Sequence, residues 1–217
     1  MGRLNALSLG RREGISSIND LALVLQRISI EEFNPLFRSR PLPDSIQIIR
    51  ATKEDGPTLL ALIDALADFE KLQKPTGEAR SRLIEHGFGG QPKFETWLAR
   101  VDGKAVAYAL AFETYSSFLA LPTLYLEDLF VLPEYRQRRI GLALFTHLVA
   151  EAQRRGCGRM EWAVLDWNVN AIRFYERLGA RWLGDWKVYR LTQDDFPGIV
   201  NNPQHGVTDG RDPVKSA

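Results

Sequence analysis

A short apolar segment, followed by a basic turn and an amphipathic segment, constrains the fold of this chain more than any other feature. Residues 124–131 are almost all large and apolar, which predicts a buried strand. Residues 141–153 then carry Leu144, Phe145, Leu148 and Val149, which are expected on the inner face of a helix. A strand that leads directly into an amphipathic helix is typical of layered α/β domains, in which helices cover a sheet.

Strand and helix signals alternate over most of the chain. Asp102-Gly103 is a hairpin signal, while Pro57 and Gly179 mark a helix start and a helix end. The expected order β-α-α-β-β-β-α-β-α-β predicts a single α/β domain with a mixed central β-sheet flanked by helices. We expect strands at residues 46–51, 94–101, 105–112, 124–131, 159–165 and 186–191, and helices at residues 57–69, 77–86, 141–153 and 170–178.

The two ends of the chain differ from this domain, which is expected to span residues 45–194. Residues 1–44 are predicted to be an N-terminal extension and linker, with a modest amphipathic helix at residues 19–37. Their pattern favours a packing arm or a poorly ordered leader over a targeting peptide. The tail, residues 195–217, is rich in Asn, Gly, Asp and Pro and is predicted to be mobile.

The composition excludes several classes of protein. With 217 residues, 45% of them hydrophobic and 25% charged, the chain is an ordinary globular protein with a net charge of +1. We therefore expect no nucleic-acid partner, and no membrane, because no apolar run approaches the ~20 residues of a membrane span. The single Cys157 fits a reducing compartment and a cytoplasmic protein. Three scattered histidines match no metal-ligand spacing, so we expect no metal.

Two adjacent carboxylates, Glu127 and Asp128, lie inside the apolar strand. Strict alternation places Glu127 with Tyr125 and Leu129 on one face, and Asp128 with Leu126 and Phe130 on the other. Burial raises the pKa of a carboxyl that lacks a partner, which suits a general base. The alternative interpretation is structural, with one carboxylate in a salt bridge and the other in solvent at a bulge.

A basic segment, residues 135–141, separates this strand from the next helix. The start of a helix offers unpaired backbone N–H groups, and Arg136, Arg138 and Arg139 add positive charge for a polyanionic ligand. Further on, Asn168 or Asn170 can cap a helix that carries Tyr175 on its inner face. Taken singly, these features are better explained as a solvated basic turn and a core tyrosine.

The order and spacing of these features resemble the GNAT acetyltransferase superfamily. The resemblance rests on a carboxylate-bearing strand, a basic loop with Gly141, a helix, a strand, and then Asn-x-x-Ala-x-x-Phe-Tyr-x-x-x-Gly-Ala. Tyr-Leu-Glu-Asp-Leu-Phe-Val at 125–131 and Leu-Asp-Trp-Asn at 165–168 are similar to the diamine, or spermidine/spermine, N-acetyltransferase branch. The resemblance covers about residues 46–193 and excludes both ends of the chain.

The resemblance implies acetyl-CoA as cosubstrate, a small-molecule amine as acceptor and a homodimer. It implies that Glu127 is the general base and Tyr175 the general acid. The acceptor pocket would contain Phe69, Glu70, Asp128 and Trp167. The cofactor would be bound by backbone groups of Leu129, Phe130 and Val131, by the loop and helix start Arg136, Gln137, Arg138, Arg139, Ile140, Gly141 and Leu142, and by Asn168 and Ala171.

The loop departs from the family pattern, because Gln137 and Arg139 replace the first two glycines of Arg-Gly-x-Gly-x-Gly. Side chains at these positions are strained if the backbone φ is positive. The acidic groups favour a diamine, polyamine or lysine-like acceptor. Two alternatives remain at this point: transfer to a protein amine or an aminoglycoside-like compound, and a non-catalytic acyl-CoA-binding regulatory domain.

Overall fold

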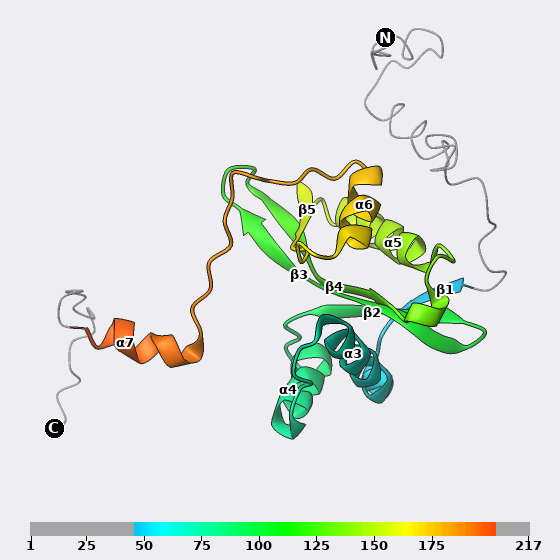
Figure 1. Cartoon of the computed structure of the whole chain (residues 1–217), viewed down its shortest axis with the longest axis horizontal. Coiled ribbons are helices and arrows are strands. Elements are labelled where there is room, and N and C mark those ends of the chain that lie inside the picture. Colours follow the sequence, from blue (N-terminus) through cyan, green and yellow to red (C-terminus); the bar gives the residue numbers. More distant parts are fainter. Residues whose placement is uncertain (1–45, 203–217) are drawn as a thin grey trace, which may run out of the picture. The chain divides into compact units, whose positions relative to one another are not determined.

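The computed structural model describes residues 46–202 of the chain (Figure 1). Contacts divide the chain into two compact units, with the division between Ala163 and Val164, and each unit is considered by itself. The expected N-terminal extension with its helix at residues 19–37, and most of the tail, lie outside the described residues.

The first unit contains a mixed five-stranded sheet in the order β1-β2-β3-β4-β5. Its first four strands pair antiparallel, and β5 pairs parallel to β4. The mixed α/β architecture predicted from the sequence is therefore confirmed. The strands are β1 (Ile46–Arg50), β2 (Glu95–Val101), β3 (Lys104–Ser116), β4 (Leu121–Val131) and β5 (Arg159–Trp162).

A tight turn and several helices connect these strands, as expected. Asp102 and Gly103 have φ values of 51° and 78°, the pair of positive angles that a tight hairpin between β2 and β3 requires. Figure 1 shows α3 and α4 on one side of the sheet and α5 on the other. These helices are α3 (Gly56–Glu70), α4 (Gly77–Phe88) and α5 (Ile140–Arg154), with short 3-10 turns at Lys53–Asp55 and Pro133–Tyr135.

Both faces of the sheet are covered by apolar side chains. Under α3, Leu59 and Leu62 pack with Leu98, Tyr108 and Phe130 in one buried cluster. Under α5, Leu144 and Leu148 are fully buried, and Phe145 meets Trp162 of β5 edge-on at 5.3 Å. The inward position predicted for Val149 is wrong, because its side chain is exposed. The site-bearing strand β4 is therefore clamped between two cores, which restricts how far its residues can shift.

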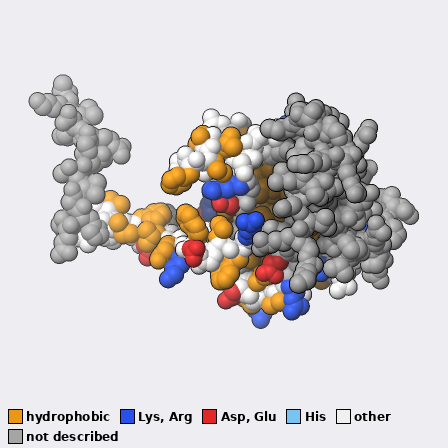
Figure 2. All heavy atoms as spheres, turned by 90° about the horizontal axis from the view of Figure 1, so that it is seen from above, with side chains coloured by type: hydrophobic (Ala, Val, Ile, Leu, Met, Phe, Trp, Pro, Cys, Tyr) orange, Lys and Arg blue, Asp and Glu red, His pale blue; other side chains and the backbone are white. Residues whose placement is uncertain are grey.

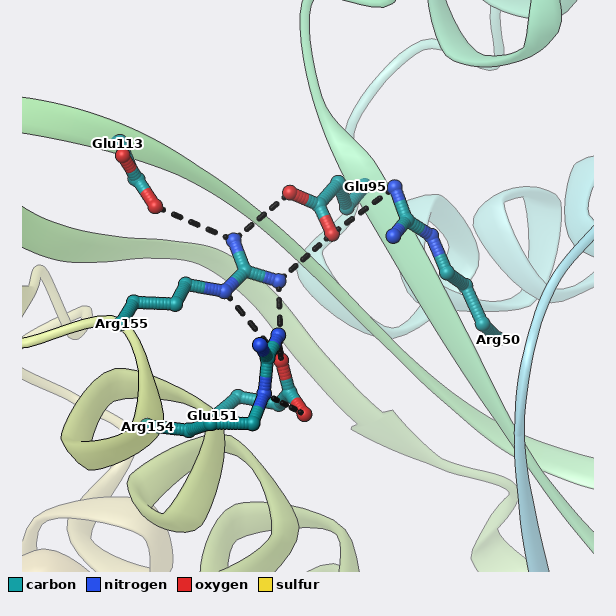
Figure 3. A network of polar contacts seen from close by, with 6 residues as sticks. All are labelled: Arg50, Glu95, Glu113, Glu151, Arg154 and Arg155. Atoms are coloured by element: carbon teal, nitrogen blue, oxygen red, sulfur yellow. Dashed lines mark hydrogen bonds and ion pairs between the residues drawn. The ribbon is translucent and has the colours of Figure 1, made fainter.

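An ion-pair network ties the end of α5 to the sheet (Figure 3). The guanidinium of Arg155 contacts both oxygens of Glu95 at 2.7 and 2.8 Å, and it also reaches Glu113 and Glu151. Glu95 is shared with Arg50 of β1. The network joins β1, β2, β3 and α5. No local pattern in the sequence indicates it.

The second unit contains α6 (Val169–Arg177), a 3-10 turn at Gln193–Asp195 and α7 (Phe196–Val200). The predicted strand at residues 186–191 is wrong, because the structure assigns no strand there. Its large apolar residues are typical of a strand. A strand also needs a neighbour for its N–H and C=O groups, and the described residues of the second unit form no other strand.

Charge on the described surface is mixed. In the face drawn in Figure 2, Lys and Arg side chains are interspersed with Asp and Glu and with hydrophobic side chains. None of the described helices has the length and apolar character needed to cross a membrane.

Candidate active site

The centre of the candidate site is a β-bulge in β4. The ladder between β3 and β4 shifts by one residue, because Leu110 lies opposite Asp128 while the next residue, Ala111, lies opposite Leu126. Glu127 is the extra residue on β4, and its side chain is exposed. Bulges of this kind disrupt a ladder locally, twist the strand and redirect side chains.

The bulge corrects the predicted distribution of side chains along β4. Strict alternation put Asp128 on the face of Leu126, but the extra residue changes the phase of the strand. Asp128 instead lies on the α3 side, where it contacts Tyr108 of the buried cluster. Leu126 pairs with Ala111, the neighbour of Leu110, and is buried outside that cluster.

The bulge also ends the pairing of β4 with β5. The parallel ladder runs from Thr123 to Leu126 and stops immediately before Glu127. β5 therefore ends at Trp162, three residues earlier than residues 159–165 predicted. Within the described strands, the edge of β4 from Glu127 to Val131 has β3 on one side and no partner on the β5 side.

Asp128 is a half-buried carboxyl with a shifted pKa. The hydroxyl of Tyr108 donates a hydrogen bond to Asp128 Oδ2 at 3.0 Å. Burial, opposed by this hydrogen bond, raises the pKa of Asp128 to about 6, and the negative charges of Glu127 and Glu70 raise it further. A carboxyl that titrates close to neutral pH inside an apolar core is typical of a functional site.

The end of α3 brings two further predicted residues to this place. The rings of Phe69 and Phe130 lie 6.3 Å apart, and Glu70 is the last residue of the helix. Burial raises the pKa of Glu70. Because Glu70 and Glu127 both act electrostatically on Asp128, the structure brings three of the predicted acidic residues together.

The loop before α5 has a backbone conformation that favours glycine, although its sequence has other residues at these positions. Gln137 and Arg139 have φ values of 61° and 60°, the left-handed region that favours glycine. Both residues therefore have the strained backbone that a side chain meets at positive φ. α5 begins at Ile140, one residue before the expected start, and Arg139 is its N-cap. The first backbone N–H groups of this helix form the kind of site that binds a phosphate.

Arg136 points to the rings at the end of α3. Its guanidinium lies 4.4 Å from the centre of the Phe69 ring and 5.6 Å from that of Phe130. Its Nε donates a hydrogen bond to the carbonyl oxygen of Val131 at 3.0 Å. Arg138 lies over the ring of Tyr135 at 5.3 Å. Arg136 thus contacts residues that were assigned to both the acceptor and the cofactor.

The remaining predicted residues belong to the second unit. Asn168 caps α6, because its Oδ1 accepts a hydrogen bond from the backbone N–H of Ala171 at 3.3 Å. Trp167 is exposed, and burial raises the pKa of Tyr175 to about 12. The Tyr175 hydroxyl is therefore protonated throughout the working pH range, as a proton donor must be.

Sequence reasoning missed Tyr108. It stands in an apolar strand where a tyrosine indicates only core packing, and its partner Asp128 lies 20 residues away. An antiparallel hairpin places Leu110 opposite Asp128 and Tyr108 opposite Phe130. Only this pairing, which depends on the position of the bulge, shows that the tyrosine reaches the carboxylate. Among residues 46–202, no cluster of three His, Cys, Asp or Glu side chains could hold a metal ion.

Comparisons with known proteins identify the family. The family model for the acetyltransferase (GNAT) family matches residues 59–180. The chain therefore belongs to the GNAT family and is an N-acetyltransferase.

Two similar curated proteins have named acceptors. Thialysine N-epsilon-acetyltransferase of Mus musculus is 32% identical over 158 residues, which are 68% of this chain and 92% of that protein. L-ornithine N5-acetyltransferase NATA1 of Arabidopsis thaliana is 43% identical over 98 residues, but the match spans only 45% of this chain and 43% of that protein.

Solved structures support the fold. An integron cassette protein from the mobile metagenome of V. cholerae has a TM-score of 0.64 and 22% identity, covering 73% of this chain and 99% of that one. A ribosomal-protein-alanine N-acetyltransferase from Brucella melitensis has a TM-score of 0.55 at 20% identity, covering 68% of this chain and 99% of that one.

Proposed function

We propose that this chain transfers the acetyl group of acetyl-CoA to a primary amine of a small cationic acceptor: a diamine, a polyamine or a lysine-like amino acid. The observation that carries the proposal is the acidic group formed by Glu70, Glu127 and Asp128 at the bulge of β4. Negative charge at this place favours an acceptor with more than one positive nitrogen. The names of the ornithine and thialysine acetyltransferases similar to this chain agree with such an acceptor.

The chain has the groups that acetyl-CoA needs. The first N–H groups of α5 and the side chains of Arg138 and Arg139 suit its phosphates. The edge of β4 that lacks a strand partner suits its amide-bearing arm, which would pair with Leu129, Phe130 and Val131. Asn168 and Ala171, at the start of α6, would contact the cofactor further along.

The acceptor must lose a proton before it reacts. An alkylamine with a pKa of ~10.4 lies about 3 units above neutral pH, so deprotonation costs ~4 kcal/mol. Glu127, which is the exposed member of the acidic group, would accept this proton through a water molecule. Phe69, Glu70, Asp128 and Trp167 would line the pocket that orients the amine.

Transfer then needs no covalent enzyme intermediate. Acetyl-CoA supplies an activated thioester, and the bond that forms joins the amine nitrogen to the acetyl carbon while the carbon–sulfur bond breaks. Tyr175 would donate its proton to the departing thiolate. Cys157 is half-buried, and burial raises the pKa of its thiol, which disfavours a route through a cysteine thiolate.

The test is release of free CoA from acetyl-CoA in the presence of putrescine, spermidine, spermine, ornithine, lysine, thialysine or a histone-tail peptide. Turnover with a small diamine or lysine-like amine is expected. Binding of acetyl-CoA without turnover on any of them would overturn the proposal and favour a regulatory acyl-CoA-binding domain. Turnover on the peptide alone would favour a protein acetyltransferase.

Two variants test the assigned roles. Glu127→Gln and Tyr175→Phe are each expected to lower kcat by about 10²- to 10⁴-fold, the usual contribution of general acid–base catalysis. Their controls are Glu78→Gln on the exposed face of α4 and Tyr115→Phe near the end of β3, which are expected to leave kcat unchanged. Equal kcat in Glu127→Gln and wild type would remove Glu127 as the base.

The proposal also includes a homodimer in the cytoplasm. The reducing cytoplasm suits a chain with a single cysteine, which is half-buried.

A further inference from the structure

Tyr108 is buried at the bottom of the acidic group. It is 0% exposed and packs in the cluster under α3, and its ring lies 6.4 Å from that of Phe130. Its hydroxyl is 3.0 Å from Asp128 Oδ2. Burial raises the pKa of Tyr108 far above its ordinary value, so the phenol stays protonated and acts as a donor at every working pH.

The surroundings of Asp128 oppose its ionisation. Burial and the charges of Glu127, on the same strand, and Glu70, at the end of α3, all raise its pKa, and among these influences the Tyr108 hydrogen bond alone lowers it. On the α3 side of the sheet, the positive charge of Arg136 lies over Phe69 and Phe130, and its side chain hydrogen-bonds to Val131. A protonated Asp128 would lose its attraction for a cationic amine.

We infer that Tyr108 is the positioning residue that keeps Asp128 ionised and oriented for the acceptor amine, and so sets the lower pH limit of amine capture. This inference rests on the proposed amine acetyltransferase activity. Tyr108 itself lies too deep to contact the acceptor, since its side chain is enclosed by α3 and the sheet.

A purely structural role for Tyr108 predicts something different. Buried phenols need a hydrogen-bond partner, and any backbone carbonyl can serve. This hydroxyl instead pairs with a carboxyl that already has two acidic neighbours. A core role predicts that loss of the hydroxyl weakens folding equally at all pH values, whereas a positioning role predicts a change in the pH profile.

The first test compares Tyr108→Phe with wild type in the pH dependence of kcat/KM for the amine. The acid limb of the variant is expected to move up by about one pH unit, because a hydrogen bond to a charged group is lost, so that amine KM rises roughly 10-fold at pH 5 and only about twofold at pH 7. The KM for acetyl-CoA is expected to stay within about twofold. Tyr125→Phe, a half-buried tyrosine on the same strand as Asp128, is the control and should leave the acid limb in place. An unmoved acid limb in Tyr108→Phe would overturn the inference.

A double-mutant cycle separates positioning from packing. At pH 5, Asp128→Asn is expected to raise amine KM, its pH profile should lack the acid limb, and adding Tyr108→Phe to it should change amine KM by less than about twofold. Independent multiplication of the two effects would contradict coupling through Asp128.

A measurement without turnover keeps this inference distinct from the proposed activity. Carbon-13 NMR of protein labelled at the aspartate carboxyl carbons, with Asp128→Asn to assign the resonance, follows the titration of Asp128 directly. Tyr108→Phe is expected to raise the titration midpoint by about one pH unit. A raised midpoint in a protein that acetylates no amine would refute the proposed activity alone, while an unchanged midpoint would refute the role of Tyr108.

Discussion

Gln137 and Arg139, in the loop before α5, have a backbone conformation that strains ordinary residues. Each has φ near 60°, where a Cβ atom crowds the following carbonyl. Strain at a site that needs a particular direction of N–H groups is a known feature of functional loops. The loop therefore keeps the backbone path suited to glycine without the glycines.

The strain predicts an inverted order of stabilities at position 139. Arg139→Gly is expected to be more stable than Arg139→Ala by about 1 kcal/mol, because glycine has no Cβ penalty at positive φ. In an ordinary helical position alanine would be the more stable of the two. Urea unfolding of the two variants gives the difference directly. An alanine variant that equals or exceeds the glycine variant would show that the loop relaxes out of the left-handed region.

Removing the charge of Asp128 is expected to raise the free energy of unfolding, by an amount that depends on pH. Its pKa of about 6 in the folded protein lies above the ordinary value of 3.8, so the folded state binds the proton more tightly than the unfolded state. The ionised carboxyl is thus destabilising above pH ~6, and this penalty vanishes as the pH falls to ~4.

Asp128→Asn is therefore expected to be about 1 to 3 kcal/mol more stable than wild type at pH 8, and similar to it at pH 4. Urea unfolding at both pH values is the measurement. A variant less stable than wild type at pH 8 would mean that the ionised carboxylate contributes net stability. The same variant should lose amine affinity, which is the usual trade between stability and function at a site.

At the scale of elements, the end of α5 is held to the sheet by one arginine. The side chain of Arg155 is 13% exposed, whereas that of its neighbour Arg154 is 68% exposed, although both contact Glu151. Ion pairs in solvent contribute little, while removal of one member of a shielded network leaves its partners unpaired. Arg154 and Arg155, which both contact Glu151 in Figure 3, can therefore be compared by substitution.

Arg155→Met is expected to lower the free energy of unfolding by about 2 to 4 kcal/mol at pH 7, and Arg154→Met by less than about 1 kcal/mol. Hydrogen bonds from Arg154 and Arg155 hold the pKa of Glu151 at about 2, below its ordinary 4.5. The stability from Glu151 is thus present above pH ~4.5 and lost as the pH falls toward 2. The loss of stability in both variants should therefore shrink in unfolding curves at pH 3, and a loss in Arg155→Met that stays constant would assign the effect of Arg155 to packing on Trp97.

At the scale of the whole molecule, the second unit exposes many large apolar side chains. Trp182, Trp186, Val188 and Tyr189 are between 78% and 88% exposed. Contiguous exposed apolar side chains mark surfaces that are covered by a partner. We expect the protein to be a homodimer, with this segment in the subunit interface.

Sedimentation equilibrium is expected to give twice the mass of one chain. A double substitution, Trp186→Ser with Val188→Ser, should shift the protein toward monomer. The matched control, Phe118→Ser in the hairpin of the first unit, removes an apolar side chain that is 98% exposed and should leave the dimer intact. A wild-type monomer would contradict the prediction.

The sequence by itself determined the alternation of strands and helices and the family of the protein. Such signals are local: apolar periodicity for α3 and α5, the Asp102-Gly103 turn, the Asn168 cap and the motif order from Tyr125 to Ala180. It also indicated that Glu70, Glu127 and Asp128 belong to one acidic site.

Only the tertiary structure decided that Asp128 packs against the buried cluster and that Tyr108 supports it. A one-residue bulge at Glu127 reverses the alternation of β4, and no local propensity predicts where an extra residue enters a ladder. The contacts between Tyr108 and Asp128, and between Arg155 and Glu95, join residues 20 and 60 positions apart. They depend on strand register and helix docking, which arise from packing over the whole first unit.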